Sequence, residues 1–255
     1  MLLAVDVGNT QTLFGLFDGD ALRADWRLAT RTEATADELG VVLRSLFAEA
    51  GLDRGAVDGV IVSSVVPDLN AVITAASRRY FDRDPLFVGP GVKTGMPILY
   101  DNPHEVGADR IVNAVAAIER HGAPVIVLDF GTATTFDVVG PGGEYLGGVI
   151  TPGLGVSAEA LFERAARLHR VDVRRPAKVI GRTTEQSIQS GLFHGYVSLV
   201  RGLVRLIEDE LALPAPVIAT GGLAPVFEPE LEFLREVDVG LTLRGLRLIW
   251  ERNRR

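Results

Sequence analysis

The residues best suited to chemistry lie in two similar loops, each of which follows a short apolar run. The first loop is Asp6-Val7-Gly8-Asn9-Thr10, after Leu2–Val5, and the second is Asp129-Phe130-Gly131-Thr132-Ala133-Thr134-Thr135, after Val125–Leu128. Glycine lets backbone N–H groups approach a ligand, and an aspartate can hold hydrated Mg²⁺. Such loops suit the β- and γ-phosphates of a nucleotide, where positioning and charge neutralisation do most of the catalysis.

The two loops form an internal repeat, because their aspartates are 123 positions apart (129 − 6) in a chain of 255 residues. After each loop the sequence keeps the alternation of a strand, through residues 12–17 and 134–139, which predicts a β-hairpin. Rossmann and Walker loops lead into a helix instead. Two interpretations stay open: a coincidence between ordinary turns, or two related α/β halves that face each other across a cleft.

A third loop, Thr220-Gly221-Gly222, follows the apolar run Val217–Ala219 and offers a flat wall for adenine or ribose. Each loop taken singly consists of standard turn residues. The three loops together favour a nucleotide site.

A polar stretch, Tyr100–Arg110, opens a predicted helix whose first turn holds Asp109 and Arg110. The structural interpretation is that the acid complements the helix dipole and caps free N–H groups. The functional alternative makes Asp109 a general base that takes a proton from a substrate hydroxyl, while Arg110 and the helix N–H groups bind an anionic group.

The elements that must position these residues alternate between strands and helices, which gives an α/β fold class. Capping-box spacing over Thr35–Glu38 predicts one helix, and apolar repeats predict another over Leu241–Trp250. We expect residues 251–255 to form a polar tail and Gly147–Gly153 to form a turn-rich bend before a helix.

The longest predicted helix covers roughly Glu185 to Leu211. Its apolar stripe is expected to contain Ile188, Leu192, Leu199, Leu203 and Leu206.

Composition excludes several classes of protein. The chain is 47% hydrophobic and 23% charged, which is typical of a globular protein. It contains no cysteine, so disulfides and thiolate chemistry are excluded. A net charge of −7 argues against a nucleic-acid partner. Neither a signal peptide nor an apolar run long enough for a membrane span is visible, so we expect a cytoplasmic protein without a membrane partner.

With these residues assembled, the chain resembles the type III pantothenate kinases, members of the acetate and sugar kinase, heat-shock cognate and actin superfamily. The resemblance covers essentially the whole chain and implies two duplicated ribonuclease H-like (actin-like ATPase) halves, residues 1–120 and 121–255, each a mixed β-sheet with flanking helices, around a central cleft. The motifs that carry it run in the family's order: Asp6–Thr10, Asp101–Arg110, Asp129–Thr135, Gly147–Gly153, Thr184–Gly191 and Thr220–Leu223.

The resemblance implies transfer of the γ-phosphoryl group of ATP to the primary hydroxyl of pantothenate, which gives 4′-phosphopantothenate in the first step of coenzyme A synthesis. It also implies a requirement for Mg²⁺ and for a monovalent cation, K⁺ or NH₄⁺. The expected assembly is a homodimer with the acceptor site at the subunit interface, and the long helix is where dimer contacts are expected.

The resemblance further assigns roles to residues. It makes Asp109 the proton acceptor and Asp129 a ligand of the monovalent cation, while Asp6 is expected to hold Mg²⁺ through water. The ATP-binding residues are Asp6, Val7, Gly8, Asn9, Thr10, Gln11, Thr12 and Leu13, with Thr132 from the opposite loop. The pantothenate-binding residues are Tyr100, Gly107, Ala108, Asp109 and Arg110, with Thr184 from the neighbouring subunit.

Some alternatives stay open. Either Thr183 or Thr184 could face the substrate, and Thr184 is preferred from its spacing to Gln189-Ser190-Gly191. The protein could also be a superfamily kinase for another small alcohol or a sugar, or a non-catalytic nucleotide-binding regulator or assembly protein. The first loop has no Walker-type lysine, so an acidic chain of this kind is expected to need added cations at its phosphate site.

Overall fold

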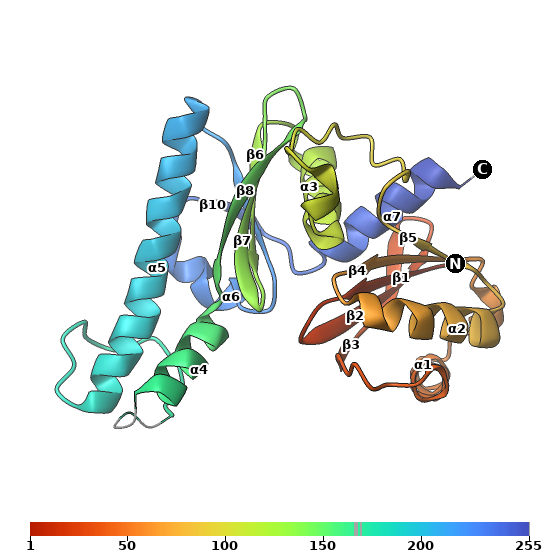
Figure 1. The fold of residues 1–255 in the computed structure, drawn as a ribbon, viewed down its shortest axis with the longest axis horizontal. Coiled ribbons are helices and arrows are strands. Elements are labelled where there is room, and N and C mark those ends of the chain that lie inside the picture. The colour runs from red at the N-terminus through yellow and green to blue at the C-terminus, as the bar shows by residue number, and fades with distance from the viewer. Residues whose placement is uncertain (166–167, 169, 255) are drawn as a thin grey trace. The chain divides into compact units, whose positions relative to one another are not determined.

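The chain folds into two compact units. The computed structural model describes residues 1–165, 168 and 170–254. Unit 1 comprises Met1–Arg120 and Gly240–Arg255, and unit 2 comprises His121–Val239 (Figure 1). None of the helices formed by the described residues combines the length and the apolar composition that a bilayer crossing requires.

Unit 1 is built on a mixed five-stranded sheet. The strand order is β3-β2-β1-β4-β5; β1 pairs antiparallel with β2 and parallel with β4. The hairpin predicted after the first loop is therefore confirmed. The strands are β1 (Leu2–Val7), β2 (Gln11–Asp18), β3 (Ala21–Ala29), β4 (Gly59–Ser64) and β5 (Pro85–Phe87).

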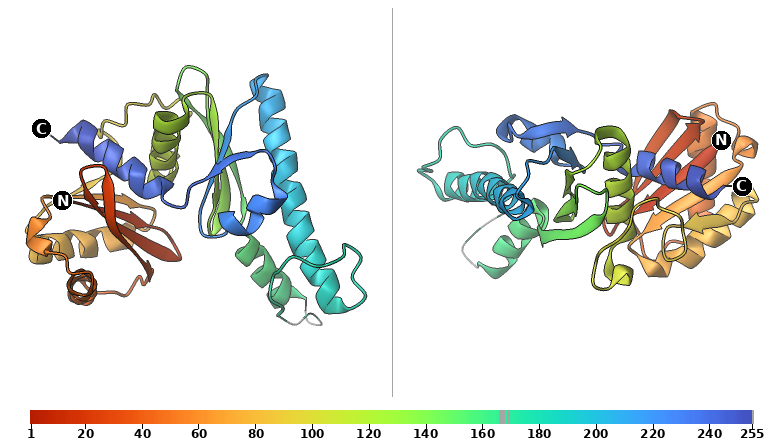
Figure 2. Two further views of the ribbon diagram at one scale, coloured as in Figure 1. Left: turned by 180° about the vertical axis from the view of Figure 1, so that it is seen from behind. Right: turned by 90° about the horizontal axis from the view of Figure 1, so that it is seen from above.

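Helices cover both faces of this sheet. Figure 2 shows α1 and α2 on one face and α7 on the other. The predicted capping box is confirmed, because the hydroxyl of Thr35 accepts from the Glu38 N–H and the carboxylate of Glu38 accepts from the Thr35 N–H. The helices are α1 (Ala36–Glu49), α2 (Asn70–Phe81), α3 (Ala108–His121) and α7 (Leu241–Asn253), with short 3₁₀ turns at Arg54–Ala56, Pro67–Leu69 and Pro103–Glu105.

The C-terminal helix α7 packs on the sheet of unit 1. Trp250 fills the space beside Gly59, where a Cβ would collide with its ring. The expected polar tail is wrong for the described residues 251–254, because the helix continues to Asn253 and its end is anchored. Arg252 pairs with Glu119 at 3.0 Å, and the Asn253 amide donates to the Lys93 carbonyl at 2.9 Å. Arg255 lies outside the described residues.

Because α7 packs on the sheet of unit 1, the boundary between the two units differs from a simple split of the chain into two halves. The compact units separate between Arg120 and His121, but residues 240–255 belong to unit 1 by their packing, whereas the expected second half included them. The assignment of functional roles to the two halves stays a prediction.

Unit 2 repeats the sheet of unit 1. Its order is β10-β9-β6-β7-β8, so a three-stranded antiparallel meander is again followed by two parallel strands. The second predicted hairpin and the fold class of two duplicated ribonuclease H-like halves are thereby confirmed. The strands are β6 (Val125–Phe130), β7 (Ala133–Val139), β8 (Tyr145–Pro152), β9 (Val217–Thr220) and β10 (Leu234–Val237).

The expected bend at Gly147–Gly153 is wrong over most of its length. Residues 145–152 form β8 and pair antiparallel with β7. The glycines are accommodated by an irregularity in the register, where Gly147 adopts a φ of 135°. The sequence looks like a turn because glycine is rare in regular strands.

The long helix α5 (Thr184–Leu211) packs on one face of the second sheet, and its predicted extent is confirmed (Figure 1). The predicted stripe is only partly correct, because Leu199 and Leu206 are exposed. The remaining helices are α4 (Leu154–Arg164), α6 (Ala224–Phe227) and a 3₁₀ turn at Glu228–Glu230. The buried side of α5 comprises Ile188, Gln189, Ser190, Phe193, Tyr196, Val197, Val200, Val204 and Ile207.

Candidate active site

The first loop is a tight turn between β1 and β2. The Gly8 N–H donates to the Gln11 carbonyl at 3.0 Å, and a Cβ on Gly8 would stand 3.0 Å from the same oxygen. Asn9, Thr10 and Gln11 are exposed at the turn. Val7 is buried in the core and can offer a ligand only its backbone. The turn therefore presents backbone and short polar groups, which is a suitable surface for phosphate oxygens.

A residue that sequence reasoning missed holds this loop in place. The Thr30 hydroxyl donates to the Gly8 carbonyl at 2.7 Å and lies 2.9 Å from the Thr12 hydroxyl. The Thr30 N–H also donates to the Thr10 carbonyl at 3.0 Å. A lone threonine after a strand carries no signal in sequence, because its partners are about twenty residues away.

The two faces of the first sheet separate the predicted ATP-loop residues. Val7 and Thr12 are paired in the β1–β2 register and lie on the face covered by α1 and α2. Since successive strand residues point to opposite faces, Asp6 and its partner Leu13 lie on the other face. Asp6 is half-buried there, at the carboxyl end of β1.

Asp109 belongs to the first turn of α3, close to the same end of the sheet. A Cβ on Gly107 would lie 2.5 Å from the Asp109 Oδ1 atom and 3.7 Å from Val65. The Val65 N–H in turn donates to the Val7 carbonyl at 3.0 Å. Val65 therefore lies close to both the start of α3 and the end of β1, which places Asp109 near the phosphate-type loop within unit 1.

The environment of Asp109 changes its acidity. Burial raises the pKa of its carboxyl above the ordinary value, and this effect outweighs the N–H and the charge of Arg110, which act in the opposite direction. The Asp109 Oδ1 atom accepts from the Arg110 N–H at 2.9 Å. The geometry is therefore compatible both with Asp109 capping the helix start and with Asp109 acting as a general base. The raised pKa favours the second role, because a more basic carboxylate takes a proton more readily.

The other predicted acceptor residues lie around this helix start. The Arg110 side chain is buried, with 7% of its surface exposed, and Tyr100 is half-buried in the segment before the helix. Asn102 caps the intervening 3₁₀ turn and donates to Glu105 at 2.8 Å. This polar segment is therefore held by its own hydrogen bonds.

The second loop in unit 2 is built around Asp129, at the carboxyl end of β6. Gly221 follows the neighbouring strand with a φ of 91°. A Cβ there would lie 2.5 Å from the Asp129 Oδ1 atom and 2.6 Å from the Phe130 carbonyl oxygen. Only glycine fits this conformation without strain. The third loop therefore leaves space for the Asp129 carboxylate and the Phe130 carbonyl oxygen, in addition to the flat surface expected from its sequence.

Thr132 is exposed at the turn that follows. The Gly131 N–H donates to the Ala133 carbonyl at 3.1 Å, and the Gly153 N–H donates to the Thr132 carbonyl at 3.1 Å. The residue before α4 therefore helps to fix the second loop, in which Thr132 is exposed.

Further polar groups of unit 2 are buried near Asp129 in the sheet. Asp137 is fully buried and accepts from the Tyr145 hydroxyl at 2.8 Å and from Thr135 at 3.1 Å. Burial raises the pKa of Tyr196 to about 12, and the charge of Asp129 acts in the same direction. Sequence reasoning missed these groups because Tyr145 reaches Asp137 only through the pairing of β7 and β8, and Tyr196 reaches Thr134 only through the packing of α5 on the sheet.

Thr183 and Thr184 differ in their environment. The Thr183 hydroxyl caps α5 by accepting from the Gln186 N–H at 3.2 Å, whereas Thr184 is the first residue of the helix and is exposed. Across the residues that the structure describes, no group of three or more His, Cys, Asp or Glu side chains is arranged to hold a metal ion.

The repeated sheet with an aspartate–glycine hairpin defines the actin-like ATPase and sugar kinase fold. Two solved structures share it at low identity. One is the inorganic polyphosphate/ATP-glucomannokinase of Arthrobacter sp. strain KM, with a TM-score of 0.53 and 17% identity over 99% of each chain. The other is the ethanolamine utilization protein EutJ of Carboxydothermus hydrogenoformans, with a TM-score of 0.58 and 14% identity over 97% of this chain and 89% of that one.

Sequence comparison identifies the family within this fold. The model of the family described as type III pantothenate kinase matches residues 2–206. The type III pantothenate kinase of Myxococcus xanthus is 56% identical over 99% of each chain, and that of Anaeromyxobacter sp. (strain Fw109-5) is 57% identical over 100% of each. The chain belongs to the type III pantothenate kinase family.

Proposed function

We propose that this chain phosphorylates pantothenate with ATP, the first step of coenzyme A synthesis, and that Asp109 is its proton acceptor. Membership of the type III pantothenate kinase family supports the reaction. The observation that supports the residue assignment is the position of Val65, which lies close to the start of α3 and is hydrogen-bonded to the end of β1 before the phosphate-type loop. A cytoplasmic location agrees with this function and stays a prediction.

The phosphates of ATP are held by the turn between β1 and β2. The residues Asn9, Thr10 and Gln11 are exposed in this turn, and their polar groups are suited to phosphate oxygens. Val7, Gly8 and Leu13 shape the turn, and Thr12 supports it from the opposite face. Thr132 in unit 2 is proposed as a further ATP ligand.

Asp109 acts on the acceptor. As the pantothenate hydroxyl oxygen forms its bond to the γ-phosphorus, the bond from that phosphorus to the bridging oxygen breaks, ADP leaves and Asp109 takes the hydroxyl proton. The raised pKa of the carboxyl strengthens it as a base. Arg110 and the positive end of the helix dipole bind the pantothenate carboxylate, and Tyr100, Gly107 and Ala108 form the rest of this subsite.

Two cation positions are proposed. Asp6 lies at the end of β1 with a half-buried carboxylate, which suits Mg²⁺ held mainly by phosphates and water. In unit 2 the Asp129 carboxylate and the Phe130 carbonyl converge on the space above Gly221, an all-oxygen cradle that suits K⁺ or NH₄⁺. Both cations would supply the positive charge that a site without a Walker-type lysine otherwise lacks.

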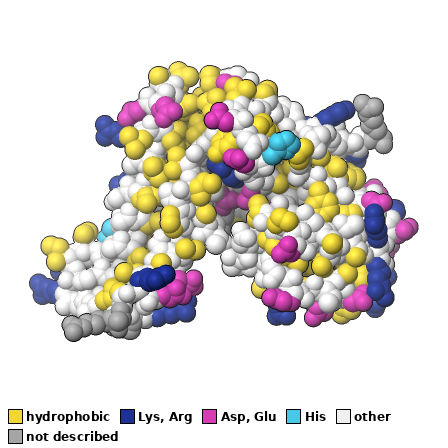
Figure 3. Space-filling model, in the orientation of Figure 1, with side chains coloured by type: hydrophobic (Ala, Val, Ile, Leu, Met, Phe, Trp, Pro, Cys, Tyr) yellow, Lys and Arg dark blue, Asp and Glu magenta, His cyan; other side chains and the backbone are white. Residues whose placement is uncertain are grey.

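A homodimer is proposed through unit 2, because this unit exposes large apolar side chains. Leu206 is 63% exposed on α5, Ile150 is 60% exposed on the edge strand β8, and Ile180 is 84% exposed just before α5. Hydrophobic side chains reach the surface of this unit in Figure 3. Burial of such residues against a second copy is a common basis of association. In the proposed dimer, Thr184 of one copy contributes to the acceptor site of the other.

An acceptor screen tests the reaction. The purified chain is incubated with labelled ATP, Mg²⁺ and K⁺ and with pantothenate, hexoses or small alcohols in parallel. We expect labelled 4′-phosphopantothenate and no comparable sugar phosphate. Phosphorylation of a sugar without turnover of pantothenate would establish the superfamily alternative, and nucleotide binding without transfer to any acceptor would support a regulator.

A further inference from the structure

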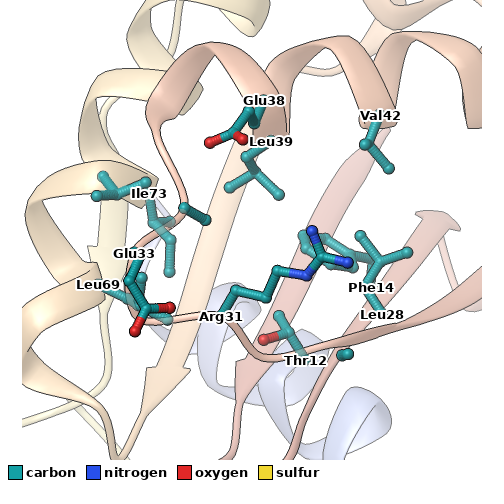
Figure 4. A pocket seen from close by; sticks show the side chains of 13 residues that line it. Thr12, Phe14, Leu28, Arg31, Glu33, Glu38, Leu39, Val42, Leu69 and Ile73 are labelled. Carbon is teal, nitrogen blue, oxygen red and sulfur yellow. The ribbon is translucent and has the colours of Figure 1, made fainter.

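Unit 1 contains a pocket that is lined by none of the residues proposed to bind pantothenate or a cation. It has a volume of about 470 Å³ and lies between the sheet and helices α1 and α2 (Figure 4). Pockets that bind small organic molecules have volumes of about 300–1,000 Å³ and mainly apolar walls. The walls here are formed largely by Phe14, Leu28, Leu39, Val42, Leu69 and Ile73.

This pocket is separate from the proposed acceptor site. Phe14 and Thr12 line it from β2, on the sheet face covered by α1 and α2. Asp6 lies on the opposite face, by the alternation of the strand. None of the residues proposed to bind pantothenate lines the pocket, so a ligand there would not occupy that subsite.

One positive charge points into the pocket. Figure 4 shows the guanidinium group of Arg31 lying along the apolar wall near Leu28 and Phe14, while Glu33 extends the other way from the same loop. The Arg31 carbonyl accepts from the Ala34 N–H at 3.2 Å, whereas its guanidinium group makes no hydrogen bond or ion pair with the residues that the structure describes.

Glu38, the third charged residue that lines the pocket, is already hydrogen-bonded within the protein. Glu38 accepts two hydrogen bonds from Thr35, at 2.8 and 2.9 Å, as part of the helix cap. These bonds lower the pKa of Glu38, and the charge of Arg31 adds a smaller effect in the same direction. The pocket thus combines apolar walls with one guanidinium group and two carboxylates, of which Glu33 points away and Glu38 is held by Thr35. The guanidinium group of Arg31 matches the two oxygens of a carboxylate.

The pocket is also connected to the phosphate-type loop. Its wall residue Thr12 lies 2.9 Å from the hydroxyl of Thr30, which donates to the Gly8 carbonyl at 2.7 Å. A ligand that packs on Thr12 would touch the same short chain of hydrogen bonds that fixes the turn.

We propose that this pocket binds an amphipathic carboxylate, with its alkyl or aryl part between the sheet and α1 and its carboxylate on Arg31, and that its occupancy tightens nucleotide binding by ordering the Thr12–Thr30–Gly8 chain. The second part rests on the proposed function, because it assumes that the Gly8 turn holds ATP phosphates. The binding itself does not depend on catalysis.

Isothermal titration calorimetry of the full chain tests the binding, with decanoate kept below its micelle concentration as the probe. We expect saturable binding of one decanoate per chain. Affinity should rise by about threefold for each methylene from hexanoate to decanoate, because each added group is buried.

Matched variants locate the ligand. Val42→Phe fills the pocket and should weaken decanoate binding by at least about tenfold, whereas Val41→Phe, at an exposed neighbouring position outside the pocket, should leave binding unchanged. Arg31→Gln should weaken decanoate binding but not decanol binding, and Arg44→Gln serves as its control. Absence of saturable binding, or equal affinities of the Val42→Phe and Val41→Phe variants, would overturn the site.

The coupling has its own readout. Saturating decanoate should lower the Kd of a non-hydrolysable ATP analogue by about fivefold, and the analogue should tighten decanoate binding by the same factor. An unchanged Kd for the analogue would overturn the coupling. If the analogue does not bind at all while decanoate does, the proposed kinase function fails and the pocket stands.

Discussion

The Asp109 carboxylate occupies the space that a side chain at Gly107 would need: its Oδ1 atom lies 2.5 Å from the position of a Cβ there. Gly107 is thus what allows the acid to fold back over the helix start, where Val65 connects it to the end of β1.

Gly107→Ala should displace this carboxylate. Because small displacements of a reacting group cost about a hundredfold in rate, we expect kcat for pantothenate phosphorylation to fall by about that factor. The Kd for an ATP analogue should change little. The control is Gly89→Ala, where a Cβ meets no atom within 4 Å, and equal kcat values in the two variants would contradict the role assigned to Gly107.

The raised pKa of Asp109 predicts the pH dependence of the rate. The base works only when it is ionised, so kcat/KM should fall on acidification at a pH above that of an ordinary aspartate, whose pKa is 3.8. A pH–rate profile of the wild-type enzyme measures this limb. If the rate instead falls only at or below pH 3.8, in enzyme that stays folded, burial does not raise the pKa of Asp109.

The same shift affects stability. A carboxyl whose pKa is raised by folding stabilises the folded state below its unfolded pKa, and this contribution is lost as pH rises through the folded pKa. Asp109→Asn should therefore raise Tm at pH 7, by about 2 °C or more, and the gain should shrink as pH falls towards 4. Thermal melts at several pH values test the sign, and a lower Tm for the variant at pH 7 would contradict it.

Thr30→Val removes the hydroxyl that holds the phosphate-type loop while keeping the size of the side chain. Loss of a hydrogen bond to a buried group costs about 1–3 kcal/mol, so the KM for ATP should rise by about tenfold, with a smaller effect on the KM for pantothenate. Thr32→Val, at an exposed position nearby, is the matched control. Identical ATP kinetics in the two variants would exclude Thr30 as a positioning residue.

The cation cradle predicts a separate phenotype. Gly221→Ala places a Cβ within 2.5 Å of the Asp129 carboxylate at a φ of 91°, so activation by K⁺ should be lost or require much higher K⁺. Gly155→Ala, where a Cβ meets nothing within 4 Å, should keep normal activation. Activity titrated against K⁺ in both variants decides this, and an unchanged K⁺ dependence in Gly221→Ala would count against the cradle.

The local features of the fold could be predicted from sequence because they depend on neighbouring residues. Both hairpins, the Thr35–Glu38 capping box and the extent of α5 follow from alternation and spacing over short stretches. The repeat of Asp6 and Asp129 also indicated the duplicated sheets correctly.

Long-range packing could not be predicted in the same way. The pattern of α7 shows that one side is buried but not which sheet covers it, and only the structure places Trp250 against Gly59. In α5, the spacing of Leu206 is that of a core residue, but Leu206 is exposed and the neighbouring residues Val204 and Ile207 are the buried ones. The Thr30 contact is similarly invisible, because hydrogen bonds to residues far along the chain leave no periodic trace.

The central claim is that Asp109 accepts the proton of the pantothenate hydroxyl, and the most direct measurement is the kcat of Asp109→Asn beside its affinity for an ATP analogue. Asp101→Asn, an exposed acid in the same segment, is the control. We predict that Asp109→Asn loses at least about a hundredfold in kcat with ATP-analogue binding nearly unchanged, while Asp101→Asn keeps normal turnover. A purified, folded Asp109→Asn enzyme with wild-type kcat would contradict the account.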